Sequence, residues 1–96
     1  PDVVEFLEYI LLQKSRDVSL EEVDCGNLAK RFVGKSIAEL KVREISGANI
    51  IGIKISGARY VFNPDPNMIL SRNDQLFVLG NPEQIKKLQE VMNSEE

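Results

Sequence analysis

Few side chains in this sequence could take part in chemistry, and no histidine is among them. Histidine is the commonest general base and the commonest ligand for transition metals, so its absence removes both roles. Cys25 is the only cysteine, and it has no partner for an internal disulfide or a zinc site. We predict that its thiol is a half-buried filler at a strand end, with a reactive thiol as the alternative. A lone cysteine also suits a reducing, cytoplasmic setting.

The serines and the acidic residues do not assemble a catalytic site. An enzyme needs a nucleophile with a base, a metal, or paired carboxylates in a cleft. The serines stand where a cap or a turn favours that residue, at Ser36, Ser46, Ser56 and Ser71. We therefore predict that the chain is not an enzyme and that it requires no cofactor.

An acidic cluster raises the question of a divalent cation. Its members are Asp17, Glu21, Glu22 and Asp24. Carboxylate oxygens suit Ca²⁺ or Mg²⁺, but the sequence has no EF-hand loop. Alternate residues of a strand point to opposite faces, so these acids cannot all converge. We predict a solvated strand face here, with a weak divalent-cation site as the alternative.

One basic residue stands beside a glycine turn. Arg43 lies near the end of a short predicted helix, Gly47 turns the chain, and Asn49-Ile50 begins the next strand. A guanidinium, an amide and exposed apolar atoms in one corner could hold a planar, anionic ligand. A cation near a helix C-terminus is also favoured by the helix dipole. The spacing alone favours this second, simpler interpretation of Arg43.

The helices that must position these residues are marked by their start signals. Asp2 can cap a first helix that runs to about Gln13 and carries a wide apolar stripe. A second, short helix begins at the capping-box pair Ser36 and Glu39 and ends at Gly47. The last helix has Asn81 as its cap, Pro82 at its first position and Gln84 at its third, and it ends near Met92.

The strands are expected at residues 18–25, 49–55, 58–62 and 75–79. In the first, Glu21-Glu22 interrupts the alternation and predicts an irregularity. In the second, the alternation predicts that Ile51, Ile53 and Ile55 share one face. Ser56-Gly57 forms a hairpin turn to the third. The order of elements predicts a two-layer α+β domain: a mixed or antiparallel sheet of about four strands, with helices on one face, preceded by an N-terminal helix.

The overall composition excludes several classes of protein. The 96 residues carry a net charge of -3, without the basic face that nucleic acid requires, so we expect no nucleic-acid partner. No apolar run approaches the ~20 residues of a membrane span, so we expect no direct membrane insertion. The chain opens at Pro1-Asp2 without an initiator methionine, and we expect it to be part of a longer polypeptide.

Five segments in this order resemble the RCK C-terminal (TrkA-C) domain. They are 34–40 (GKSIAEL), 47–53 (GANIIGI), 63–66 (NPDP), 74–80 (DQLFVLG) and 82–85 (PEQI). The resemblance covers about Val18 to Met92, and residues 2–7 are similar to the segment that precedes this domain in potassium-channel gating subunits. We therefore expect residues 1–15 to form a linker helix and residues 16–96 to form the RCK C-terminal domain.

The resemblance implies a regulatory role and a ligand. Such domains lie on the cytoplasmic side of potassium channels or transporters, usually after a Rossmann-like nucleotide-binding lobe. They pair into dimers and take part in rings that gate the pore. Some bind cyclic di-AMP between two paired copies, whereas others respond to Ca²⁺ or other ligands, often outside this lobe. For this chain the resemblance implies cyclic di-AMP as the favoured regulatory ligand and Ca²⁺ as a less favoured one.

The resemblance also implies the ligand site. Positions matching the family pattern are Ile37, Arg43, Asn49 and Ile50, with Pro64 or Pro66 as the last member. The sequence departs from the family at Lys41, where an Asp is common, and at Ala58-Arg59, where such sites often carry a His.

Two other functions remain open at this point. The domain could be a pure assembly module whose dimer interface holds a gating ring together while sensing occurs elsewhere. It could also be an unrelated small-molecule regulator, such as an amino-acid-binding domain of similar size.

Overall fold

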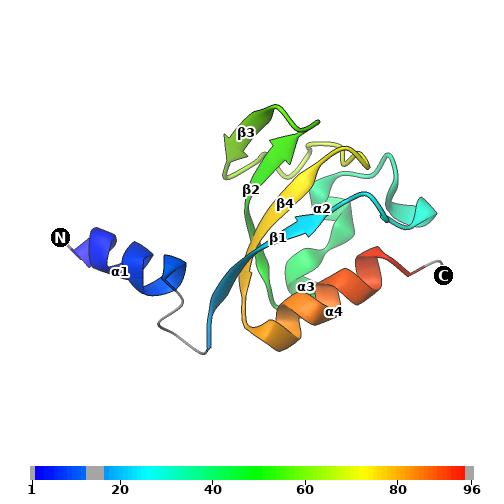
Figure 1. Ribbon diagram of the computed structural model, residues 1–96. Coiled ribbons are helices and arrows are strands. Elements are labelled where there is room, and N and C mark those ends of the chain that lie inside the picture. Colours follow the sequence, from blue (N-terminus) through cyan, green and yellow to red (C-terminus); the bar gives the residue numbers. More distant parts are fainter. Residues whose placement is uncertain (1, 13–16, 95–96) are drawn as a thin grey trace.

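A four-stranded antiparallel sheet forms the centre of the computed structural model, which describes residues 2–12 and 17–94 (Figure 1). The strands lie in the order β1-β4-β2-β3, so β4, the last in sequence, is central. The elements are α1 (Asp2–Leu11), β1 (Ser19–Asp24), the 3₁₀ helix η1 (Lys30–Phe32), α2 (Ile37–Leu40), α3 (Val42–Ser46), β2 (Asn49–Ile55), β3 (Arg59–Phe62), β4 (Gln75–Gly80) and α4 (Pro82–Met92). The predicted fold class is confirmed.

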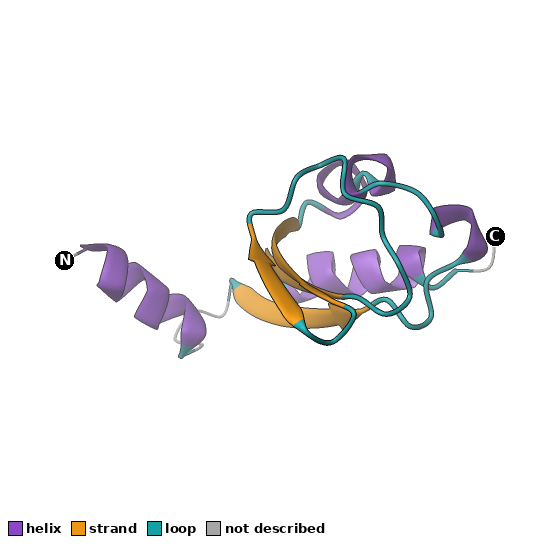
Figure 2. Ribbon diagram, turned by 90° about the horizontal axis from the view of Figure 1, so that it is seen from above, coloured by secondary structure: helices purple, strands orange, loops and turns teal. Residues whose placement is uncertain are grey.

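The core lies between one face of this sheet and the helices α2, α3 and α4 (Figure 2). Alternation along β4 points Leu76 and Val78 toward the helices, where both are fully buried. Leu88 and Met92 of α4 meet them from the helical layer and are also fully buried. We call this the covered face of the sheet and the opposite one the open face.

A β-bulge in β2 changes the predicted assignment of faces. Ile50 pairs with Val78 and Gly52 pairs with Phe77, so Ile51 has no pairing partner in β4 and forms the bulge. Such an extra residue shifts the alternation by one position. Ile50 therefore joins Ile53 and Ile55 on the covered face, and Ile51 points to the open face. The prediction that Ile51 shares a face with Ile53 and Ile55 is wrong.

Two further local predictions are corrected. The ladder of β1 with β4 is continuous from Ser19 to Asp24, so the irregularity expected at Glu21-Glu22 is absent from it. The single helix expected from Ser36 to Gly47 is broken into α2 and α3, because Lys41 adopts the left-handed conformation with φ 54°. A lysine carries no turn signature, and the break could not be anticipated from its side chain.

The predicted helix starts are confirmed in atomic detail. The Ser36 hydroxyl accepts from the Glu39 amide at 3.2 Å, and the Glu39 carboxylate accepts from the Ser36 amide at 3.1 Å. Asn81 and Gln84 form the same reciprocal pair at the start of α4, both at 2.8 Å. These bonds satisfy backbone donors that a helix start otherwise leaves without partners.

A buried carboxylate fastens the hairpin turn to the start of β4. Asp74 is only 3% exposed. One of its oxygens accepts from the backbone amide of Ser56 at 3.1 Å, and the other accepts from that of Ser71 at 3.0 Å. Two loops far apart in sequence are thereby held by one side chain.

The N-terminal helix is confirmed as α1, which stands beyond the end of β1 and away from the helical layer (Figures 1 and 2). Its predicted end at Gln13 and the predicted domain boundary between residues 15 and 16 lie outside the described residues, and the boundary stays a prediction. Among the residues that the structure describes, no helix is long and apolar enough to cross a membrane.

Candidate ligand groove

A groove of about 260 Å³ lies where α2 and α3 meet the start of β2 and the loop after β3. The structure brings all the predicted site residues into its wall: Ile37, Arg43, Asn49, Ile50 and Pro64. Pro66 lines it as well, so both candidates for the last position are present. The remaining lining residues are Ala38, Lys41, Val42, Glu44, Ala48 and Asn63.

The helical side of the groove is set by two left-handed residues. Lys41 ends α2 and begins α3, and its conformation turns the chain so that both helices border the same hollow. Gly47 ends α3 with φ 83° and sends the chain into β2. Between them, the Ser46 hydroxyl donates to the carbonyl of Val42 at 2.7 Å and accepts from the amide of Ala48 at 3.1 Å. These bonds fix Arg43 relative to Asn49.

The opposite wall is a proline-containing loop held against α2. Asn63 has φ 52°, and its amide donates to the carbonyl of Ile51 at 2.9 Å. The carbonyl of Pro66 accepts from the amide of Ala38 at 2.8 Å. Because each proline fixes its own φ, this wall has little backbone freedom.

The charge of the groove favours an anion. Lys41, Arg43 and Glu44 line it, and all three side chains are exposed. Within the described part of the chain, the Arg43 guanidinium has no hydrogen-bond or ion-pair partner, so its donors are free to meet a ligand. Ile37 and Ile50 supply apolar walls that suit a planar ring. The groove can thus hold an anionic group beside an apolar one.

Cys25 is fully buried, more deeply than the predicted half-buried position. Burial raises the pKa of its thiol to about 12, and the negative charges of Asp74 and Asp24 add to this effect. The thiol is therefore protonated at neutral pH, which argues against the reactive alternative.

The acidic residues of β1 are spread over two faces. Glu21 pairs with Val78 of the covered face and Glu22 pairs with Phe77 of the open face. Asp24 accepts from the amide of Gly26 at 2.8 Å and shapes the turn that follows the strand. In residues 2–12 and 17–94, no group of three or more Cys, Asp or Glu side chains could hold a metal ion.

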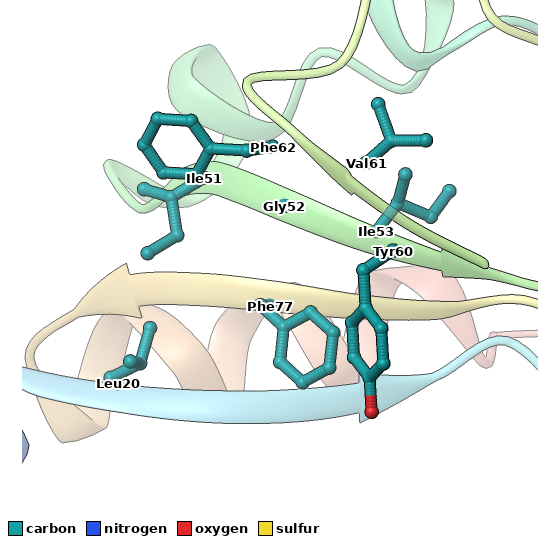
Figure 3. Close-up of a pocket in the computed structure, with 8 residues that line it drawn as sticks. All are labelled: Leu20, Ile51, Gly52, Ile53, Tyr60, Val61, Phe62 and Phe77. Atoms are coloured by element: carbon teal, nitrogen blue, oxygen red, sulfur yellow. The ribbon is translucent and has the colours of Figure 1, made fainter.

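The open face carries a concavity that the sequence analysis did not predict (Figure 3). It measures about 300 Å³ and is lined by Leu20, Ile51, Gly52, Ile53, Tyr60, Val61, Phe62 and Phe77. The rings of Tyr60 and Phe77 stack with centroids 5.9 Å apart and planes at 28°. Tyr60 and Phe62, two residues apart on a predicted strand, were the available signal, because such a spacing puts both on one face.

Comparison with protein families identifies the fold independently. The family model described as the TrkA-C domain matches residues 28–93. Potassium channel protein 1 of Methanocaldococcus jannaschii is 27% identical over 96 residues. That match includes the whole of this chain but only 28% of the relative, so the chain spans just over a quarter of the curated protein that it matches.

Solved structures of RCK C domains and of a channel that contains one also match this chain. The RCK C domain of the potassium transport protein KtrA, in complex with cyclic di-AMP, has a TM-score of 0.74 and 28% identity, covering 93% of this chain and 94% of that one. The RCK_C domain dimer of S. agalactiae BusR, also with cyclic di-AMP, has a TM-score of 0.69 and 26% identity, covering 77% and 89%. The GsuK channel bound to NAD has a TM-score of 0.68 and 25% identity, covering 95% of this chain but 16% of that one.

Proposed function

Because this chain belongs to the TrkA-C domain family, we propose that it is the ligand-sensing, dimerising lobe that gates a potassium channel or transporter. In this proposal the lobe works on the cytoplasmic side of the membrane, next to a Rossmann-like nucleotide-binding lobe and the pore of its parent protein. It carries out no catalysis and binds no nucleic acid. Its ligand lies in the groove between α2, α3 and the start of β2.

The observation that carries the proposal is the convergence of the predicted site residues on that one groove. They come from α2, α3, β2 and the loop after β3, so residues that are separate in the sequence border one groove, which supports a shared ligand site. The groove offers the Arg43 guanidinium, which has no partner among the described residues, together with the amide of Asn49 and the apolar walls of Ile37 and Ile50.

Cyclic di-AMP is the ligand that we propose. A crevice between two symmetric copies suits a two-fold symmetric dinucleotide, because each Arg43 can meet one phosphate while the isoleucines flank the bases. Solved complexes of KtrA and BusR domains with this ligand, at 28% and 26% identity, support the choice. Ca²⁺ is the less favoured ligand, since the groove contributes one carboxylate, Glu44.

The positions where the sequence departs from the family are compatible with an anionic ligand. Lys41 lines the groove and adds a positive charge where the family commonly has an acid. Ala58 and Arg59 lie at the hairpin, at the other end of β2 from Asn49, so they do not alter the groove of their own copy.

Binding becomes gating through a difference in affinity. If the ligand binds one arrangement of the paired lobes more tightly than another, the equilibrium shifts by that difference in binding free energy. A purely structural assembly module would have the same fold and pairing but no such ligand.

Calorimetry with cyclic di-AMP separates these two functions. We expect the wild-type chain to bind, and Arg43→Ala to weaken binding by on the order of 10- to 100-fold, because each charge-assisted hydrogen bond contributes about 1.5–3 kcal/mol. Lys87→Ala is the matched control, since Lys87 is an exposed cation on α4 outside the groove. Absence of binding by the wild type would support the assembly module, and binding unaffected by Arg43→Ala would refute the proposed site.

A further inference from the structure

Lys41 lies at the junction of two short helices and borders the ligand groove. It ends α2 and begins α3, and it lines the hollow together with Arg43. In an unbroken helix, residues two positions apart do not share a face. Because the helix is broken at Lys41, two cations that a continuous helix would point in different directions border the same groove.

The backbone of Lys41 has a conformation that a side chain disfavours. Its φ is 54° and its ψ is 47°, in the left-handed region where glycine is the common residue. Three non-glycine residues of the described chain have positive φ, Lys41, Ser56 and Asn63. Two of these, Lys41 and Asn63, border the groove. Residues in such sparsely populated conformations cluster at ligand sites, so the lysine at this turn points to a role for its side chain.

Local structure accounts for the backbone of Lys41 but not for its side chain. Its amide donates to the carbonyl of Ala38 at 3.2 Å, and its carbonyl accepts from the amide of Ile45 at 3.0 Å. A glycine would make both of these bonds. The ammonium is exposed, and in the part of the molecule that the structure describes it has no hydrogen-bond or ion-pair partner, Glu44 included. Its charge is therefore available to a bound molecule.

The charges that border the groove suit phosphate. Lys41 and Arg43 are positive and Glu44 is negative, so two cations less one acid leave each copy with one net positive charge. Without Lys41, each copy would be neutral there. An ammonium is a compact charge with three donors and a guanidinium is a planar fork, so the two can contact different oxygens of one phosphate.

We propose that Lys41 and Arg43 form a two-cation phosphate subsite, in which Lys41 contacts the ligand directly and sets how strongly the groove selects charged ligands. This inference rests on the proposed function, in which Arg43 alone meets the phosphate, and it adds Lys41 as a specificity-determining residue. The left-handed backbone lowers the stability of the fold while it keeps the ammonium at the groove. Stability and ligand affinity are therefore opposed at this residue.

Two substitutions separate the backbone of Lys41 from its charge. Lys41→Gly and Lys41→Gln both remove the ammonium, but only glycine is relieved of the disfavoured conformation. We expect Lys41→Gly to raise the urea midpoint of unfolding and Lys41→Gln to leave it unchanged. In calorimetry, we expect both to weaken cyclic di-AMP binding by about 10- to 25-fold, because each of two copies loses a contact that contributes about 3- to 5-fold.

The controls keep the charge at this position or remove one elsewhere. Lys41→Arg retains a cation on the same backbone, so binding should be retained. Lys87→Ala removes a charge from an exposed position of α4 outside the groove and should leave the affinity unchanged. Added salt should weaken binding to the wild type more than binding to Lys41→Gln, because the contact that the variant lacks is a screened pair of charges.

Adenosine 5′-monophosphate tests the subsite separately from the dinucleotide. Its phosphate carries roughly -1.5 to -2 charges at neutral pH, and a single copy of the groove can bind it. In NMR titrations we expect it to bind the wild-type chain and to bind Lys41→Gln about 3- to 5-fold more weakly. Such binding in the absence of any cyclic di-AMP binding would refute the dinucleotide of the proposed function and support this subsite.

Three results would overturn the inference. Equal ligand affinity of the wild type, Lys41→Gly and Lys41→Gln would make Lys41 a turn residue only, while cyclic di-AMP binding that depends on Arg43 would leave the proposed function intact. A loss of affinity in Lys41→Gly but not in Lys41→Gln would show that the backbone matters and the charge does not. Failure of both ligands to bind the wild type would show that the groove is not a phosphate site.

Discussion

The substitution Gly47→Ala tests how the turn beside the groove is stabilised. Gly47 ends α3 with φ 83°, a conformation that a side chain disfavours. A Cβ at this position would also lie 2.7 Å from Nε2 of Gln84. Gln84 is not free to move without loss, because its Oε1 accepts from the amide of Asn81 at 2.8 Å and completes the start of α4.

The cost of Gly47→Ala therefore has two parts. Placing alanine in the left-handed region costs about 1–2 kcal/mol. Displacing Gln84 costs the hydrogen bond to Asn81, which contributes about 0.5–1.5 kcal/mol. The displacement adds no more than that, since the atom encountered is the far end of a flexible side chain. We expect the free energy of unfolding to fall by about 1.5–3.5 kcal/mol in total.

Urea denaturation with two companion variants separates the parts. Gly57 has φ 73° and no atom within 4 Å of its would-be Cβ, so Gly57→Ala reports the conformational part alone, about 1–2 kcal/mol. In Gly47→Ala/Gln84→Ala the obstructing side chain is gone. We expect this double variant to lose about 1 kcal/mol less unfolding free energy than the two single variants lose together. This account would be refuted if the losses in unfolding free energy of the two single variants added exactly in the double variant. It would also be refuted if Gly47→Ala and Gly57→Ala lost equal amounts.

Two further predictions concern titration and thiol chemistry. Hydrogen bonds from the Ser36 amide and hydroxyl hold the pKa of Glu39 below its ordinary value, so their stabilisation is present above about pH 4.3 and is lost as the pH falls through the folded-state pKa. Ser36→Ala should cost about 1 kcal/mol in urea denaturation at pH 7 and less in acid; an equal loss at both pH values would contradict this. The pKa of Cys25 is raised to about 12, so stability should fall as the pH rises above about 8.5, where the unfolded thiol ionises and the folded one does not. Cys25→Ala should remove that fall, and a thiol reagent should label the native wild-type chain no faster than the chain unfolds.

Local chemistry explains which features the sequence could predict. The capping pairs at Ser36 and Asn81 involve residues three positions apart, so their hydrogen bonds follow from spacing alone. The hairpin at Ser56-Gly57 is equally local. The convergence of Arg43 with Asn49 was suggested by the turn at Gly47, although the choice of a ligand site over a surface cation came from the family resemblance.

The features that were missed depend on contacts between distant residues. Ile50 and Ile51 are both apolar, so the pattern of β2 fits either phase, and only pairing with β4 places the bulge between them. The left-handed turn at Lys41 is made by a residue that carries no turn signature, so its side chain does not predict it. Strand periodicity also cannot tell which face a helix will cover, so the exposure of Tyr60 was not predictable.

The buried carboxylate of Asp74 has a mechanical consequence. It holds the hairpin turn through Ser56 and the approach to β4 through Ser71, and β4 is one of the two inner strands of the sheet. The turn of the hairpin is therefore joined to β4 in two ways, by the pairing of β2 with β4 and by this one side chain. We therefore expect a displacement of the hairpin turn to be passed to β4 through the Asp74 carboxylate as well as through the β2–β4 ladder.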